Sequence, residues 1–144
     1  MKPSTKLKLI REKGGIEPLA LAAASGISGP EYYDLEATDD LENSIDLDHL
    51  KRLSSALNIR LATLFSPNVP DDRISPTDLR SLLEEKIKSR HVELSQFEDE
   101  VGWELAAFME YPESALLRWN MTCLYDVCRA LGCSWVAVLN GVDS

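Results

Sequence analysis

Long apolar runs are missing from this sequence, and their absence argues against a membrane protein. No stretch of about eighteen apolar residues occurs in the 144-residue chain, so we expect no transmembrane helix and no membrane partner. Met1-Lys2-Pro3 leads into a polar, charged segment in place of the apolar core of a signal peptide. The protein is therefore expected to remain in the cytoplasm.

Residue patterns typical of metal sites and catalytic centres are also missing. The three cysteines, Cys123, Cys128 and Cys133, are five residues apart and do not form the CxxC pairs of a zinc site. Their clustering in an apolar region suits reduced thiols that pack as small hydrophobic side chains. His49 and His91 lie far apart, and no glycine-rich loop is followed by Lys and Ser or Thr. We expect no metal, no cofactor, no small-molecule substrate and no enzymatic activity.

Basic residues are scarce relative to acidic ones. The chain has 15 Lys and Arg against 24 Asp and Glu, a net charge of −9. A nucleic-acid binder gains most of its non-specific affinity by placing Lys and Arg against phosphates, although one local basic face is enough. Residues 1–66 carry 8 basic and 10 acidic groups, whereas residues 77–144 carry 6 and 12. The second half is therefore the more acidic one.

The sequence contains an internal repeat. Residues 21–27 and 97–103 share a bulky apolar residue five positions before a glycine and another directly after it, at an offset of 76. Residues 50–59 parallel residues 124–133 at an offset of 74, so the second copy has a connecting loop two residues shorter. Agreement over this many apolar positions indicates an internal duplication.

Helical periodicity dominates both copies. Apolar residues recur at helical spacing in residues 47–57, and each copy predicts about five short helices without alternating strand signals. Asn58 and Gly132 stand where a helix ends and a left-handed residue is favoured. The chain is therefore predicted to be all-α.

Residues 67–76 are predicted to link the two copies. This stretch contains three prolines among polar residues, and Thr77 or Asp78 is expected to cap the helix that follows. Units of about 65 residues are close to the lower limit of independent stability, so we expect the copies to pack against each other or against a second chain.

The apolar frame of the first copy resembles a known family. Its matching positions are Leu21-Ala22, Gly26-Ile27-Ser28, Leu35-Glu36, Leu50, Leu53, Ala56-Leu57, Ile59 and Leu64-Phe65. This pattern resembles the phage-repressor-like (Xre-type) helix-turn-helix family over residues 1–66, while residues 77–144 match in core positions and resemble a diverged duplicate. The resemblance implies two tandem five-helix lambda-repressor-like units, whose third helices would occupy the place of a DNA-recognition helix.

The positions that this resemblance assigns to DNA carry unusual residues. The groove-facing set would be Ser28, Gly29, Pro30, Glu31, Tyr33 and Asp34, with Tyr32 and Leu35 facing the core. Pro18 stands where family members usually carry a Gln that clamps a phosphate. The candidate DNA-facing residues are Ser28 and Tyr33, near bases, and Lys2, Lys6 and Lys8, near phosphates.

The corresponding helix of the second copy is apolar. Leu105, Ala106 and Met109 fall on its nominally exposed side and predict a protein interface, although packing on the first copy explains them equally well. Phe108 and Tyr111 are expected to face inward. Trp119 falls in a loop and suits an interface anchor, with folding back over the core as the alternative.

Two functional hypotheses follow. In the first, the protein is a regulator of the repressor-like family that acts chiefly through protein contacts or self-association, because its DNA-facing surface is acidic. In the second, it is a dimeric, sequence-specific DNA-binding transcriptional regulator that uses the first helix-turn-helix.

Overall fold

A computed structural model describes residues 1–143, and the regular structure among them is entirely helical. The elements are α1 (Pro3–Lys13), α2 (Pro18–Ser25), α3 (Gly29–Ala37), α4 (Leu41–Ser44), α5 (Leu47–Ala56), the 3-10 helix η1 (Leu61–Leu64), α6 (Pro76–Arg90), α7 (Leu94–Val101), α8 (Ala106–Glu110), α9 (Pro112–Leu116), α10 (Met121–Leu131) and α11 (Trp135–Asp143). The predicted all-α class is confirmed. Across the described residues, no helix is both long and apolar enough to cross a bilayer.

Corresponding elements of the two halves end in the same way. Gly26 after α2 and Gly102 after α7 both adopt left-handed backbone angles, with φ of 71° and 81°. The predicted left-handed residues after α5 and α10 are also confirmed, since Asn58 and Gly132 have φ of 57° and 69°. A left-handed residue at this position lets the last carbonyls of a helix find backbone donors. The backbone at these four helix ends therefore follows the spacing that the sequence comparison predicts.

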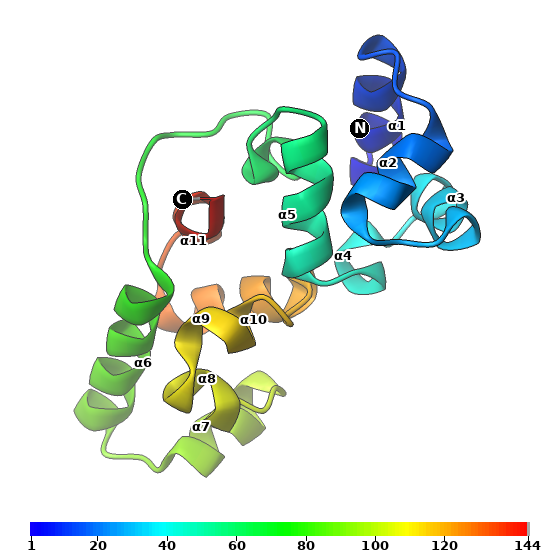
Figure 1. Ribbon diagram of the computed structural model, residues 1–144. Helices are drawn as coiled ribbons and strands as arrows, with labels where there is room; N and C mark the ends of the chain where they lie inside the picture. The colour runs from blue at the N-terminus through cyan, green and yellow to red at the C-terminus, as the bar shows by residue number, and fades with distance from the viewer. Residues whose placement is uncertain (144) are drawn as a thin grey trace.

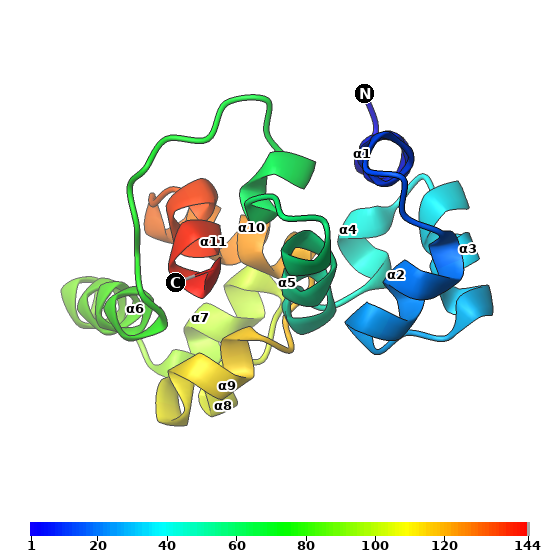
Figure 2. The same cartoon turned by 45° about the horizontal axis from the view of Figure 1, so that its top comes forward.

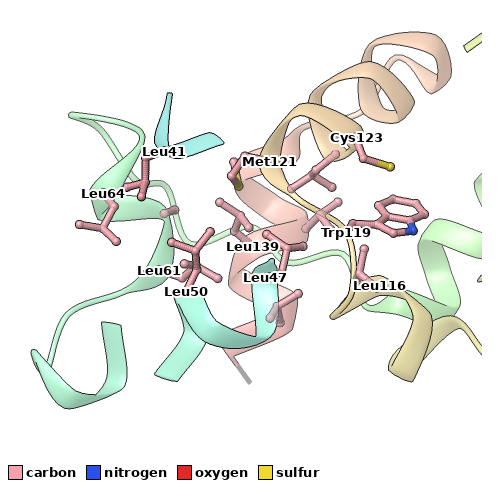
Figure 3. Packing of buried hydrophobic residues seen from close by; sticks show 14 of the residues in the cluster. Leu41, Leu47, Leu50, Leu61, Leu64, Leu116, Trp119, Met121, Cys123 and Leu139 are labelled. Carbon is pink, nitrogen blue, oxygen red and sulfur yellow. The ribbon is translucent and has the colours of Figure 1, made fainter. Parts of the chain in front are cut away.

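The two halves share one apolar core. The α1–α4 group lies at one end of the molecule and α6–α9 at the other, with α5 between them and α11 beside it (Figure 1). Side chains from both halves meet in one cluster, among them Leu47 and Leu61 from the first and Met121 and Leu139 from the second (Figure 3). The halves pack against each other, as expected.

Backbone hydrogen bonds also join the halves at the start of α5. The amide of Leu47 donates to the carbonyl of Trp119 (2.8 Å), and that of Asp48 donates to the carbonyl of Leu117 (2.9 Å). Asp46 and Asn120, which cap α5 and α10, also form an antiparallel bridge with each other. The first amides of a helix have no partner within it, so the second half satisfies donors that α5 itself leaves open.

The predicted linker is held against α11 by hydrogen bonds. Figure 2 shows residues 65–75 arching over this helix. The side-chain amide of Asn140 donates to the carbonyls of Pro70 (2.7 Å) and Asp72 (2.8 Å), and the amide of Ile74 donates to the carbonyl of Ala137 (2.9 Å).

The expected cap of α6 was wrong by two residues or more. Ser75 caps the helix, because its hydroxyl accepts from the amide of Asp78 (3.1 Å). Pro76, the last residue of the predicted linker, already occupies the first turn, where a proline ring is pre-set for helical geometry and its missing N–H is not needed.

Gly141 permits residues 65–75, which we call the strap, to lie close to α11. Adding one methyl group at this position is therefore expected to change the stability of the protein. A Cβ at position 141 would lie 2.1 Å from the carbonyl oxygen of Ile74, a backbone atom. We expect Gly141→Ala to lower the free energy of unfolding by about 2 kcal/mol or more, because the strap must move away. Chemical denaturation measures this value.

Gly14→Ala is the matched control. Gly14 has right-handed backbone angles, and a Cβ there would have no neighbour nearer than 3.5 Å. Its substitution is expected to change stability by less than about 0.5 kcal/mol. Equal losses in both variants would contradict the role assigned to Gly141.

Candidate functional site

A buried ion pair fixes α3 against α1. The guanidinium of Arg11 donates to both carboxylate oxygens of Glu36, from Nε to Oε2 (2.6 Å) and from Nη2 to Oε1 (3.1 Å). The hydroxyl of Tyr32 donates to the same carboxylate, and Nη1 of Arg11 donates to the carbonyl of Ile16 (2.9 Å). Both ion-paired side chains are 10 % exposed. A two-pronged pair of this kind sets orientation as well as distance.

The surroundings keep this carboxylate ionised. Burial by itself would raise the pKa of Glu36, but hydrogen bonds from Arg11 and Tyr32 outweigh burial and lower the pKa below its ordinary value of 4.5. The hydrogen bond to Glu36 raises the pKa of Arg11, and burial raises the pKa of Tyr32. The cluster therefore carries one positive and one negative charge at neutral pH.

The core contacts of α3 leave its opposite side free. Tyr32 and Leu35 are buried, as expected from the sequence. Ser28 caps α3, since its hydroxyl accepts from the amide of Glu31 (3.2 Å) and donates to the Glu31 carboxylate (3.0 Å). Ser28, a predicted DNA-facing residue, is exposed, but its hydroxyl is engaged within the helix.

Two large apolar side chains project from the free side. Leu19 on α2 is 60 % exposed and Tyr33 on α3 is 53 % exposed. Gly29 lies one turn before Tyr33 on α3, and a Cβ there would come 2.7 Å from Cδ2 of Leu19. The absence of a side chain at Gly29 therefore lets Leu19 lie close against α3. We use the name α2–α3 face for the exposed residues Leu19, Tyr33, Glu31 and Asp34 of these two helices; Glu31 and Asp34 also line a groove toward α5, whereas Tyr33 does not.

The α2–α3 face belongs to a segment without positive charge. Residues 14–50 contain nine Asp and Glu but no Lys or Arg, and they include all of α2, α3 and α4. Glu31 and Asp34 form no ion pair with any residue in 1–143. Phosphates approaching this surface would meet like charge.

The lysines predicted to contact DNA lie on or just before α1. Lys2 forms an ion pair with Asp39 (2.5 Å), and Nζ of Lys6 donates to the carbonyl of Ser66 (3.5 Å). Lys8 is exposed, and its charge helps to lower the pKa of Glu36. Two of the three lysines thus have partners within the chain.

The second half contradicts part of the predicted protein interface. Leu105 is fully buried, and its amide donates to the carboxylate of Glu98 (2.6 Å). Trp119 is 8 % exposed and its ring lies 4.8 Å from that of Phe108, so the alternative of folding back over the core is confirmed. Leu105 and Trp119 belong to the core because apolar side chains of neighbouring elements cover them.

A break in the helix explains the remaining differences in this region. Pro112 stands where the first half has Glu36, and α8 ends two residues before it. The residue preceding a proline is disfavoured in helical conformation, and Tyr111 accordingly has φ of −131° and ψ of 72°. Tyr111 is 62 % exposed, so the expectation that it faces inward was wrong. Ala106 is exposed and Met109 is partly buried.

The cysteines pack as expected from their apolar surroundings. Cys123 and Cys128 are buried, and Cys133 is half-buried. Burial, aided by the charge of Asp126, raises the pKa of Cys123 to about 12, which leaves its thiol protonated. Among residues 1–143, no group of three or more potential ligands is placed to hold a metal ion.

A groove beside α3 was not foreseen from the sequence. It runs between α3 and the start of α5, has a volume of about 430 Å³, and brings Glu31 and Asp34 together with Asp46 and His49. The Asp46-x-x-His49 spacing was a usable signal, since residues three apart at a helix start lie close together. Comparisons of the chain with family models, curated proteins and solved structures find no match.

The buried ion pair predicts a specific loss of stability in acid. Because the pKa of Glu36 is lowered in the folded state, its contribution is present above about pH 4.5 and is lost as the pH falls through the folded-state pKa. We expect Glu36→Gln to lower the free energy of unfolding by about 3 kcal/mol at pH 7, because Arg11 stays buried without its counter-charge. Denaturation between pH 7 and acid should show a flatter pH profile for the variant.

Glu100→Gln provides the control for this prediction. Glu100 pairs with Arg90 (2.7 Å), but both side chains are exposed to solvent, which screens the interaction. This variant is expected to unfold nearly like the wild type at pH 7. A loss as large as that of Glu36→Gln would show that burial is not what makes the Arg11–Glu36 pair important.

Proposed function

We propose that this chain is a regulatory protein of the repressor-like helix-turn-helix kind, built from two tandem units, that acts chiefly through contacts with another protein. The contact surface we assign is the α2–α3 face of the first half. This assignment replaces the surface expected in the second half, where Leu105 and Trp119 are buried.

The observation that carries the proposal is the composition of the α2–α3 face. Its exposed apolar side chains, Leu19 and Tyr33, are typical anchors of protein interfaces, where an aromatic ring offers a large contact area with little rotational freedom to lose. Its charged members, Glu31 and Asp34, are both acidic. A DNA-reading helix instead relies on Arg, Lys, Asn or Gln for base contacts and on basic residues for phosphates.

A DNA-binding regulator is the second candidate. The observation that favours it is the order α2, left-handed Gly26, α3, which keeps the spacing of a helix-turn-helix. Lys8 on α1 is exposed and available for a phosphate. On this hypothesis Tyr33 would lie at the DNA surface, so one experiment separates the two candidates.

Photo-crosslinking from position 33 tests the proposal directly. Tyr33 would be replaced by a benzophenone-bearing phenylalanine in cells that naturally produce the protein, and the crosslinked products would be separated by nuclease and protease treatment. We expect protease-sensitive, nuclease-resistant adducts. The control places the same residue at Tyr111, an equally exposed tyrosine of the second half, and should give few adducts. Nuclease-sensitive adducts at position 33 would favour the DNA-binding candidate.

Titration against random-sequence duplex DNA gives an independent check. A protein that uses several phosphate contacts loses affinity steeply between about 50 and 200 mM salt. We expect no saturable binding by fluorescence anisotropy at the lower salt concentration. Measurable affinity with a steep salt dependence would contradict the proposal.

A further inference from the structure

The groove between α3 and α5 has an apolar floor and acidic walls. Ile27, Leu35 and Ile45 contribute the apolar part; Ile27 and Leu35 are buried and Ile45 is half-buried. Thr38, Ser44 and His49 add polar side chains to the lining. Glu31, Asp34 and Asp46 contribute carboxylates. Its volume of about 430 Å³ falls within the range of sites that accept small ligands or a few side chains.

The carboxylates on the α3 side of the groove have no counter-charge. Glu31 accepts one hydrogen bond, from the hydroxyl of Ser28, and neither Glu31 nor Asp34 pairs with a cation in residues 1–143. On the α5 side, Asp46 lies 2.6 Å from Nδ1 of His49 and caps α5 through the amide of the same residue. A cation entering the groove would therefore meet two carboxylates without a counter-charge on the α3 side.

No Lys or Arg of the chain lines the groove. Glu31, Asp34 and Leu35 share one side of α3, since they are three and four residues apart, and no Lys or Arg occurs from residue 14 to residue 50. Lys51 and Arg52 are the first basic residues after this segment; neither lines the groove, and Arg52 already pairs with Asp48 (3.1 Å). Neither carboxylate on the α3 side of the groove is therefore paired with a cation among the described residues.

We propose that this groove binds a segment of a partner protein in which an apolar side chain stands next to Lys or Arg. The apolar side chain would cover Ile45 and the edges of Ile27 and Leu35, and the cation would pair with Glu31 and Asp34. Arginine suits these carboxylates best, because its planar fork donates two hydrogen bonds at once. The inference rests on the proposed function and names the chemistry of the partner.

Other occupants fit the groove less well. Nucleic acid would bring phosphates against carboxylates, and a second copy of this chain carries a net charge of −9. The apolar floor would gain nothing from a purely hydrophilic cation. An apolar residue beside a basic one would contact both the apolar residues and the carboxylates of the groove.

Synthetic peptides give a defined test with the full-length protein. The probe is a fluorescent amphipathic peptide of about fifteen residues with leucines on one face and arginines beside them. Two further peptides replace either the arginines by glutamates or the leucines by serines. We expect saturable binding of the first peptide, no binding of the second, and binding weakened by about tenfold for the third, since it lacks apolar anchors.

A matched pair of double variants locates the binding. Glu31→Gln with Asp34→Asn removes two charges from the groove wall with little change in shape, and we expect about tenfold weaker binding of the Leu/Arg peptide. Glu85→Gln with Glu93→Gln removes the same charge from exposed sites outside the groove and should change affinity less than about threefold. Circular dichroism and thermal unfolding establish that both variants are folded.

Each contrary result overturns the inference. Equal losses in both double variants would mean unspecific attraction to an acidic protein, and undiminished binding to the groove variant would place the site elsewhere. Failure of the wild type to bind the Leu/Arg peptide, or a concentration-dependent dimer in sedimentation that is lost in the groove variant, would also refute it. Nuclease-sensitive crosslinks at position 33 would defeat the proposed function whatever the peptides do, so the two failures are distinguishable.

Discussion

The first turn of α5 depends on the second half of the chain. Its leading amides, from Leu47 and Asp48, donate to the carbonyls of Trp119 and Leu117. Buried donors without partners would cost free energy, so the two halves cannot separate without exposing this turn to water or leaving it unsatisfied. Because α2 packs on α5 and α3 packs on α2, the position of the α2–α3 face follows from this junction.

A second constraint distinguishes the two halves of the chain. In the first, Glu36 extends from the last turn of α3 to Arg11 on α1, and the helix continues unbroken for nine residues. In the second, Pro112 occupies the matching place, and the corresponding region divides into two helices of five residues, α8 and α9. One half thus has an unbroken α3, while the other buries Leu105 and exposes Tyr111.

Charge is distributed unevenly around α3. The chain's 15 basic residues all lie outside residues 14–50, where α2, α3 and α4 lie. α2 and α3 therefore combine acidic residues, which line the groove, with the exposed side chains of Leu19 and Tyr33. Such a surface pairs naturally with a basic, partly apolar protein surface, because charge complementarity speeds association and apolar anchors slow dissociation.

The sequence by itself determined the helical class and the local backbone at helix ends. Helical periodicity and a left-handed residue such as Asn58 or Gly132 follow from interactions within a few residues, so they were predictable. The burial of Tyr32 was expected from the resemblance to a known family. Tertiary structure alone decided that Leu105 is buried, because periodicity shows which residues are apolar but not which neighbour covers them. The groove likewise exists only because α3 and the start of α5, which α4 separates along the chain, both pack against α2.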